Sequence, residues 1–293
     1  MKAFEFVAAR DSQHAVALLA QYAPSVRVVA GGTDLLADLK FSSHVPKVVV
    51  DISRADDLRT IAVTEEGLSI GTLVTHTEIM RSPVIREMFP ALVDAAHTIG
   101  AVQTRNLGTL GGNLVTAVPS MDSGPTLVAL DARVTIDGSG GRRQIPLTEF
   151  FVGPRKTALK PDELLIEILI PKASLSKPTQ FLKFGLRKGQ ALALVNVAAG
   201  FWPDWTKNVF TAPRIALGAV APTVIRAPQA EAFLEGRAMT PEAMAEAGQI
   251  AVGEVKPISD FRASAGYRRD LVAVLTKRAL EGAYALAQSR KKQ

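Results

Sequence analysis

The chain has 293 residues, of which 47% are hydrophobic, and a formal net charge of +6. This length and apolar content are enough to bury the cores of two or three domains. No apolar run reaches the roughly 18–20 residues that a membrane-spanning helix needs. The N-terminal segment lacks the apolar block of a signal peptide, so we expect a cytoplasmic protein.

The sequence contains no cysteine. Disulfides, cysteine-bound iron–sulfur clusters, cysteine zinc sites and thiol nucleophiles are therefore excluded on this chain. The four histidines are scattered without an HExxH pair, so we expect no metal site. The basic residues form no stripe with interleaved aromatics, which argues against nucleic acid. The positive charge fits an anionic cofactor or an acidic partner better.

The first predicted elements alternate between strand and helix. Apolar residues recur at helical spacing after Asp11 and Ser12, either of which could cap the helix. VRVVA at 26–30 reads as a strand that runs into two glycines, and Thr33 or Asp34 then looks like the N-cap of a second helix. KVVVDI at 47–52 is the next buried strand. We assign residues 1–55 to a first subdomain.

The middle of the chain reads as hairpins and short helices. A hairpin is expected to turn at residues 65–67, and short helices are expected after Thr75, Pro83 and Pro90. A glycine-rich loop is expected from Ile99 to Pro119. The remaining expectations are a helix near Pro125, a hairpin over 132–147 and a buried strand over 163–171. We assign residues 56–175 to a second subdomain.

The pattern changes after the linker candidate SLSKPT at 174–179. Three apolar segments up to residue 220 predict an antiparallel sheet, and the rest of the chain predicts helices. We assign residues 179–290 to a C-terminal domain of antiparallel strands plus helices. The whole chain is therefore predicted to have an α+β fold.

The segment AGGTDLL at 30–36, here called the first loop, joins a strand to a helix through two glycines. Glycine lets the backbone turn sharply and lets amides approach an oxygen closely. A helix start adds unpaired N–H donors, so this arrangement can bind phosphate. A purely structural turn is the alternative, because tight strand-to-helix connections need glycine in any case.

The segment NLGTLGGN at 106–113, here called the second loop, contains three glycines, two asparagines and a threonine. Its backbone amides and side-chain donors are expected to converge on a polar, anionic ligand. The alternative is a glycine-rich Ω-type loop without a ligand. Two such loops in one compact region suit a diphosphate with a sugar at each end. An aspartate at Gly32 or Gly111 is therefore expected to expel the ligand and leave the fold intact.

The common nucleotide-binding motifs are missing. No GxGxxG follows the first strand, and no GxxxxGK[ST] sequence occurs. A dinucleotide would therefore have to be held by a different motif.

The segments VVAGGTDLL and TIGAVQTRNLGTLGGN, followed by Asp122, resemble the FAD-binding subunits of the molybdenum hydroxylase family. These include the carbon monoxide dehydrogenase medium subunit and the FAD domain of xanthine dehydrogenase. The likeness includes LIEILIP, the Lys183 to Arg187 strand and a helical C-terminal part. It implies a vanillyl-alcohol-oxidase-type (PCMH-type) FAD-binding domain of two α/β subdomains, followed by the family's C-terminal domain.

The resemblance implies a role for individual residues. The first loop would wrap the diphosphate, Asp122 would bind a ribose or adenine-side group, and Lys183 would lie near the isoalloxazine and stabilise its anionic reduced form. Leu192 could cover one face of the flavin. The cofactor-binding residues implied are Val28, Val29, Ala30, Gly31, Gly32, Thr33, Asp34, Leu35, Ile99, Thr109, Leu110, Gly111, Gly112, Asn113, Asp122, Leu165, Lys183 and Leu192.

Two departures from the family pattern bear on how FAD would be held. Some relatives tether FAD through a histidine directly after the glycine pair, where this chain has Thr33, and no cysteine is available either. The resemblance therefore implies non-covalent FAD. Position 192 is Leu where relatives often carry an acidic or aromatic residue, which leaves the acceptor that docks there open.

The family implies that partner chains carry the other cofactors. A small subunit would hold two [2Fe–2S] clusters, a large subunit would hold molybdopterin, and the assembly would be a dimer of heterotrimers. We nominate no catalytic acid or base on this chain. The alternatives are a stand-alone flavin oxidase or dehydrogenase of the same fold and a non-catalytic nucleotide-binding module. Arg187, by contrast, reads equally well as a solvated surface residue.

Overall fold

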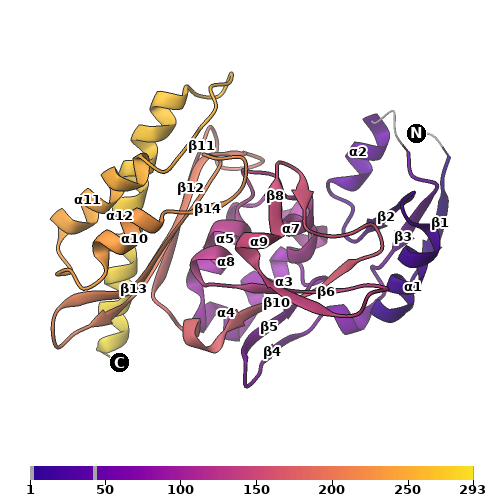
Figure 1. Ribbon diagram of the computed structural model, residues 1–293, viewed down its shortest axis with the longest axis horizontal. Coiled ribbons are helices and arrows are strands. Elements are labelled where there is room, and N and C mark those ends of the chain that lie inside the picture. The colour runs from indigo at the N-terminus through magenta and orange to yellow at the C-terminus, as the bar shows by residue number, and fades with distance from the viewer. Residues whose placement is uncertain (1–2, 42–44, 293) are drawn as a thin grey trace.

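The structure, a computed structural model, describes residues 3–41 and 45–292. Three large sheets follow one another along the longest axis of the molecule, from the N-terminal part to the C-terminal part (Figure 1). Each sheet comes from a continuous stretch of sequence. The α+β fold expected from the sequence is confirmed.

The first sheet is parallel and has the strand order β1-β3-β2. Its central strand is buried because its valines face helix α1 on one side and α2 on the other. Asp11 caps α1 as expected, since its carboxylate accepts a hydrogen bond from the His14 amide at 2.7 Å. The elements are β1 (Glu5–Ala8), α1 (Ser12–Tyr22), β2 (Val26–Val29), α2 (Leu35–Phe41) and β3 (Val48–Asp51).

The second sheet is antiparallel and has the order β4-β5-β10-β6-β7, with β10 at its centre. Both hairpins predicted for this part of the chain are present. The strands are β4 (Ile61–Val63), β5 (Gly67–Gly71), β6 (Arg133–Asp137), β7 (Arg143–Pro146) and β10 (Leu164–Pro171), and a small two-stranded sheet pairs β8 (Phe151–Gly153) with β9 (Lys156–Thr157).

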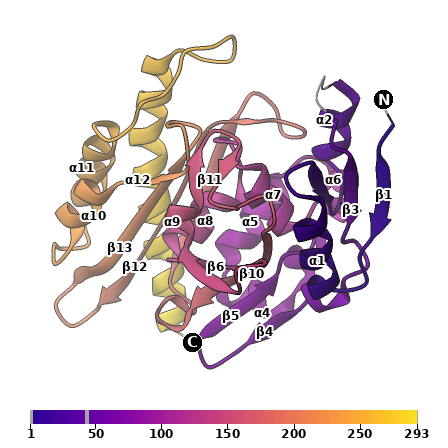
Figure 2. The same cartoon turned by 45° about the vertical axis from the view of Figure 1, so that its right-hand side comes forward.

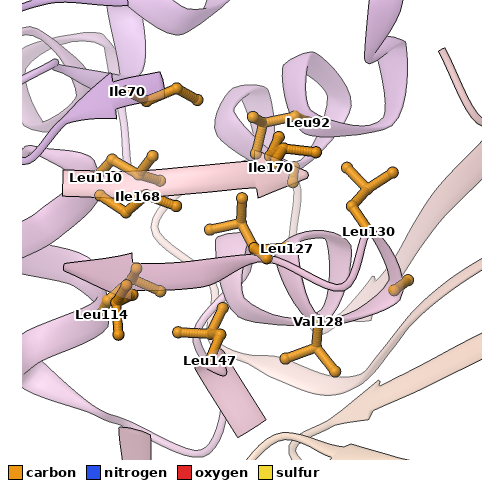
Figure 3. Packing of buried hydrophobic residues seen from close by; sticks show 14 of the residues in the cluster. Ile70, Leu92, Leu110, Leu114, Leu127, Val128, Leu130, Leu147, Ile168 and Ile170 are labelled. Carbon is orange, nitrogen blue, oxygen red and sulfur yellow. The ribbon is translucent and has the colours of Figure 1, made fainter. Parts of the chain in front are cut away.

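Short helices cover one face of the second sheet. Ile168 and Ile170 of β10 pack against Leu110, Leu114 and Leu127 from these helices (Figure 3). The apolar run around β10 is therefore explained by burial, as expected. The helices are η1 (Asp56–Leu58), α3 (His76–Arg81), α4 (Pro83–Met88), α5 (Pro90–Thr98), α6 (Val102–Leu107), α7 (Leu110–Thr116), α8 (Ser123–Ala129) and α9 (Leu147–Phe150).

The region expected to be one long glycine-rich loop contains two of these helices, α6 and α7. Thr109 caps α7, because its hydroxyl accepts a hydrogen bond from the Gly112 amide at 3.0 Å. Glycine is a poor helix former, so Gly111 and Gly112 concealed this helix in the sequence. The second loop is therefore mostly helical.

The third sheet is antiparallel, and both of its faces are covered. Helices α10 and α12 pack on one face, with α11 against both of them, and α5 and α8 of the middle part pack on the other (Figure 2). The elements are η2 (Lys172–Ser174), β11 (Thr179–Gly185), β12 (Ala193–Asp204), β13 (Val209–Gly218), β14 (Ile225–Arg226), α10 (Pro228–Leu234), α11 (Pro241–Val252) and α12 (Ala265–Lys291).

Within residues 3–41 and 45–292, no helix combines the length and the apolar character that crossing a bilayer requires. The proposed boundaries at residues 55, 175 and 179 remain predictions.

Candidate functional site

A cleft of about 570 Å³ lies where the first loop, the second loop and the start of β10 meet. This volume is within the range of small-molecule and cofactor pockets, about 300–1,000 Å³. Most of the residues predicted to bind a cofactor line it: Val28, Ala30, Gly31, Gly32, Thr33, Asp34, Leu35, Ile99, Thr109, Gly111, Gly112, Asn113 and Leu165. The structure thus brings together segments that are up to 137 residues apart in the sequence, from Val28 to Leu165.

The first loop presents free backbone donors to this cleft. Among the described residues, the amides of residues 31–35 have no hydrogen-bond acceptor. Gly32 adopts φ +70°, a conformation that L side chains rarely adopt, so glycine is favoured at this turn. Helix α2 has only seven residues, so these amides matter more for binding an anion than a helix dipole does.

The second loop differs, because its backbone amides are already paired within the protein. Leu110 donates to the Val74 carbonyl at 2.8 Å, and Gly111 donates to the Thr72 carbonyl at 3.0 Å. The Gly112 amide is paired with the Thr109 hydroxyl. The second loop can therefore offer side chains to a ligand, but not the amides of these three residues.

The glycines of the two loops allow close packing of the protein against itself. A Cβ on Gly31 would lie 1.8 Å from the Leu107 carbonyl oxygen, so the two loops touch through their backbones. A Cβ on Gly111 would lie 1.6 Å from the Thr72 hydroxyl oxygen. The expectation that an aspartate at Gly111 would leave the fold intact is therefore wrong, because that position points into packed protein.

Asp122 and Lys183 form a buried ion pair with a distance of 2.5 Å between their charged atoms. Lys183 also donates to the Thr98 carbonyl, and Asn196 donates to the other oxygen of Asp122 at 2.9 Å. Burial raises the pKa of Asp122, while Lys183 and the hydrogen bonds oppose that rise. Neither residue lines the cleft, but Asp122 is adjacent to Ser123, whose hydroxyl donates to the Asn113 side chain at 2.6 Å.

Three further predicted residues also lie outside the cleft lining. Val29 and Leu110 are buried in the core, with exposed fractions of 8% and 0%. Leu192 is 56% exposed and follows the turn in which the Gln190 amide donates to the Gly100 carbonyl. Side-chain contacts to a ligand in this cleft are therefore not available to Val29 and Leu110.

The cleft has lining residues that the sequence did not reveal. Thr72 comes from the segment before α3, which runs beside the second loop, His76 is the first residue of α3, and Thr104 comes from α6. Arg155 lies in the β8–β9 turn and forms an ion pair with Asp38 of α2 at 2.5 Å. Only the sheet topology brings these residues to the loops, and no local motif marks them.

Comparison with known proteins identifies the family. Residues 2–173 match the FAD binding domain in molybdopterin dehydrogenase, and residues 180–283 match the CO dehydrogenase flavoprotein C-terminal domain. The chain belongs to this family. It is an FAD-binding subunit of the molybdenum hydroxylase type and, as such, part of an oxidoreductase of several subunits.

Individual relatives agree over nearly the full length. The carbon monoxide dehydrogenase medium chain of Hydrogenophaga pseudoflava is 32% identical, with 96% of this chain and 97% of the relative covered. The nicotinate dehydrogenase FAD-subunit of Eubacterium barkeri is 34% identical, with 95% of each covered.

Solved structures show the same agreement. Carbon monoxide dehydrogenase from Hydrogenophaga pseudoflava, in a form lacking the Mo-pyranopterin moiety, superposes with a TM-score of 0.92 at 32% identity, covering 97% of this chain and 98% of the other. Quinoline 2-oxidoreductase from Pseudomonas putida 86 gives 0.90 at 31% identity, covering 98% and 100%.

The cleft fits FAD on its own chemistry. A diphosphate needs several N–H donors at close range, and the amides of residues 31–35 provide them. Gly108 lines the cleft between the loops, and a side chain there would crowd the Thr104 carbonyl. Apolar residues such as Ile99, Leu159 and Leu165 line the same cleft and can pack against aromatic rings.

Proposed function

We propose that this chain holds FAD non-covalently in the cleft and passes electrons between partner subunits and an external acceptor. The observation that carries the proposal is the row of amides at residues 31–35, which have no acceptor among the described residues and belong to a loop that lines the same cleft as Thr109 and Asn113. The side chain of Thr33 is not of the kind that usually forms a covalent bond to a flavin. When bound, FAD supplies reversible one- and two-electron redox chemistry.

The residues of this chain then bind and orient the cofactor. The first loop takes the diphosphate through its amides, and Thr109 and Asn113 of the second loop add side-chain contacts. The Lys183–Asp122 pair lies behind the second loop and holds its geometry through Ser123 and Asn113. Because Lys183 is paired with Asp122 and neither residue lines the cleft, we expect Lys183 to support the second loop more than to place a free charge beside the flavin.

Membership of the family supports a proposal for the wider assembly. We propose a small subunit with two [2Fe–2S] clusters and a large molybdopterin subunit as partners, in a dimer of heterotrimers in the cytoplasm. The substrate would then be oxidised on the large subunit. This chain would need only to bind and tune FAD, which is why no catalytic acid or base is assigned to it.

Purification of the chain with whatever accompanies it tests this assembly. We expect an iron–sulfur chain and a molybdopterin chain to co-purify, and we expect intact FAD to be released on denaturation. A colourless protein would contradict the cofactor assignment. Substrate turnover by the chain alone with O₂ would instead support a stand-alone flavin oxidase.

Gly32→Asp, with Gly32→Asn as its matched control, tests the position of the diphosphate. Both side chains tolerate a positive φ, and a Cβ at this position meets only the flexible Leu36 and Val29 side chains. The carboxylate of the aspartate would compete for the free amides and repel the diphosphate. We expect FAD to bind at least about tenfold more weakly to the Asp variant than to the Asn variant. Equal affinities, measured by equilibrium dialysis, would contradict the assignment.

A further inference from the structure

The His76 side chain is buried beneath the meeting point of the two loops. It is 2% exposed, it lines the cleft, and its Nδ1 atom is buried without a hydrogen-bond partner among the described residues. A buried N–H without an acceptor costs free energy, so this nitrogen is not expected to carry the proton of a neutral ring. The His76 backbone amide donates to the Gly108 carbonyl at 3.1 Å, which fixes the residue against the second loop.

Cδ2 of the imidazole lies close to Gly108, which lines the cleft as His76 does. A Cβ on Gly108 would lie 2.9 Å from the Thr104 carbonyl oxygen, 3.4 Å from Cδ2 of His76 and 3.7 Å from the Thr33 hydroxyl. Thr33 belongs to the first loop and Gly108 to the second. The part of the cleft at Gly108, here called the Gly108 hollow, is therefore bounded by both loops and by His76.

The charge state of His76 is set by its surroundings. Burial, assisted by the nearby positive charge of Arg105, lowers the pKa of His76 to about 4. The ring is therefore neutral at physiological pH, and one nitrogen carries a proton. Since Nδ1 has no acceptor, the proton is expected on Nε2, the atom bonded to the Cδ2 that faces the Gly108 hollow.

We propose that His76 is a further cofactor-binding residue, whose Nε2–H donates a hydrogen bond to an anionic diphosphate oxygen at the Gly108 hollow. This inference rests on the proposed FAD site and adds to it a neutral donor from outside both loops. The diphosphate is the favoured acceptor because the hollow adjoins Thr33, next to the free amides of the first loop. A neutral donor stabilises the diphosphate without adding a buried charge.

His76→Gln and His76→Leu separate hydrogen bonding from packing. Glutamine can place an N–H near the position of Nε2, whereas leucine only fills the space. Dissociation constants for FAD and for ADP, a probe with the diphosphate but no flavin, are measured on the full-length chain. We expect the Leu variant to lose about 10- to 100-fold affinity for both ligands and the Gln variant to lose much less.

Each result decides between the explanations. Equal losses in the Gln and Leu variants, or no loss in either, would overturn the hydrogen-bond role. A loss for FAD without a loss for ADP would move the contact to the flavin and also overturn it. Melting temperatures without ligand identify a variant that merely fails to fold. If the unsubstituted protein binds no FAD, the proposed function fails, and this outcome is distinct from a failure of the His76 role.

Discussion

The two glycine-rich loops look alike in sequence and use their glycines in different ways. Among the described residues, the first loop leaves the amides of residues 31–35 without an acceptor, and all five residues line the cleft. In the second loop the amides of residues 110–112 are hydrogen-bonded within the protein, and Gly111 allows close contact with Thr72. Richness in glycine therefore indicates close approach of backbone, but it does not say whether a ligand or the protein itself approaches.

The largest expected effect is the loss of stability in Gly111→Ala, and the adjacent Gly112→Ala is its control. A Cβ at residue 111 would meet the Thr72 hydroxyl and carbonyl, whereas a Cβ at residue 112 meets only the rotatable Thr109 hydroxyl at 2.9 Å. We expect the free energy of unfolding to fall by about 3 kcal/mol for Gly111→Ala and by less than about 1 kcal/mol for Gly112→Ala. Denaturant unfolding without FAD measures both. Similar values for the two would show that Gly111 is not a packing glycine.

The pH dependence of stability tests the residue beneath the second loop. His76 binds a proton near pH 6.5 in the unfolded chain but only near pH 4 in the folded protein. The unfolded state therefore holds more protons between these values, and stability falls as the pH falls through this window. We expect a loss of about 2 kcal/mol between about pH 7 and about pH 5, absent in His76→Gln. An unchanged pH profile in His76→Gln would assign the dependence to other groups.

Thr109→Val against Thr33→Val gives the smallest expected effect and compares the loops directly. Each change removes one hydroxyl at nearly constant volume. Thr109 caps α7, so its loss is expected to cost about 1 kcal/mol of stability. The Thr33 hydroxyl makes only a weak 3.5 Å contact with Asp34, so we expect less than about 0.5 kcal/mol. Equal losses of stability in the two variants, measured by thermal unfolding without FAD, would contradict this difference between the loops.

Local sequence patterns predicted much of this fold. The hairpins around residues 65–67 and 138–141, the helices after Thr75, Pro83 and Pro90, and the central strand β10 all follow from turn residues and apolar periodicity. The α6–α7 pair was missed because glycine argues against helix. The α7 helix is stabilised by contacts with Thr72 and Val74, which are distant in sequence.

The candidate site was only partly accessible from the sequence for the same reason. The loops could be found as local motifs, and most of their residues line the cleft. His76 and Arg155 could not be found, since they reach the cleft through sheet topology and a turn elsewhere in the chain. The pairing of Lys183 with Asp122 also joins residues 61 positions apart. Sequence reasoning had given those two residues separate roles.

The contact between Gly31 and Leu107 has one further consequence. Two main chains meet there with no side chain between them. The separation of the cleft walls at this point is therefore set by backbone geometry, and a change of rotamer cannot alter it. A side chain at position 31 would clash with the Leu107 carbonyl and push the first loop away from the second loop. The absence of a Cβ at position 31 therefore sets how closely the two loops approach each other.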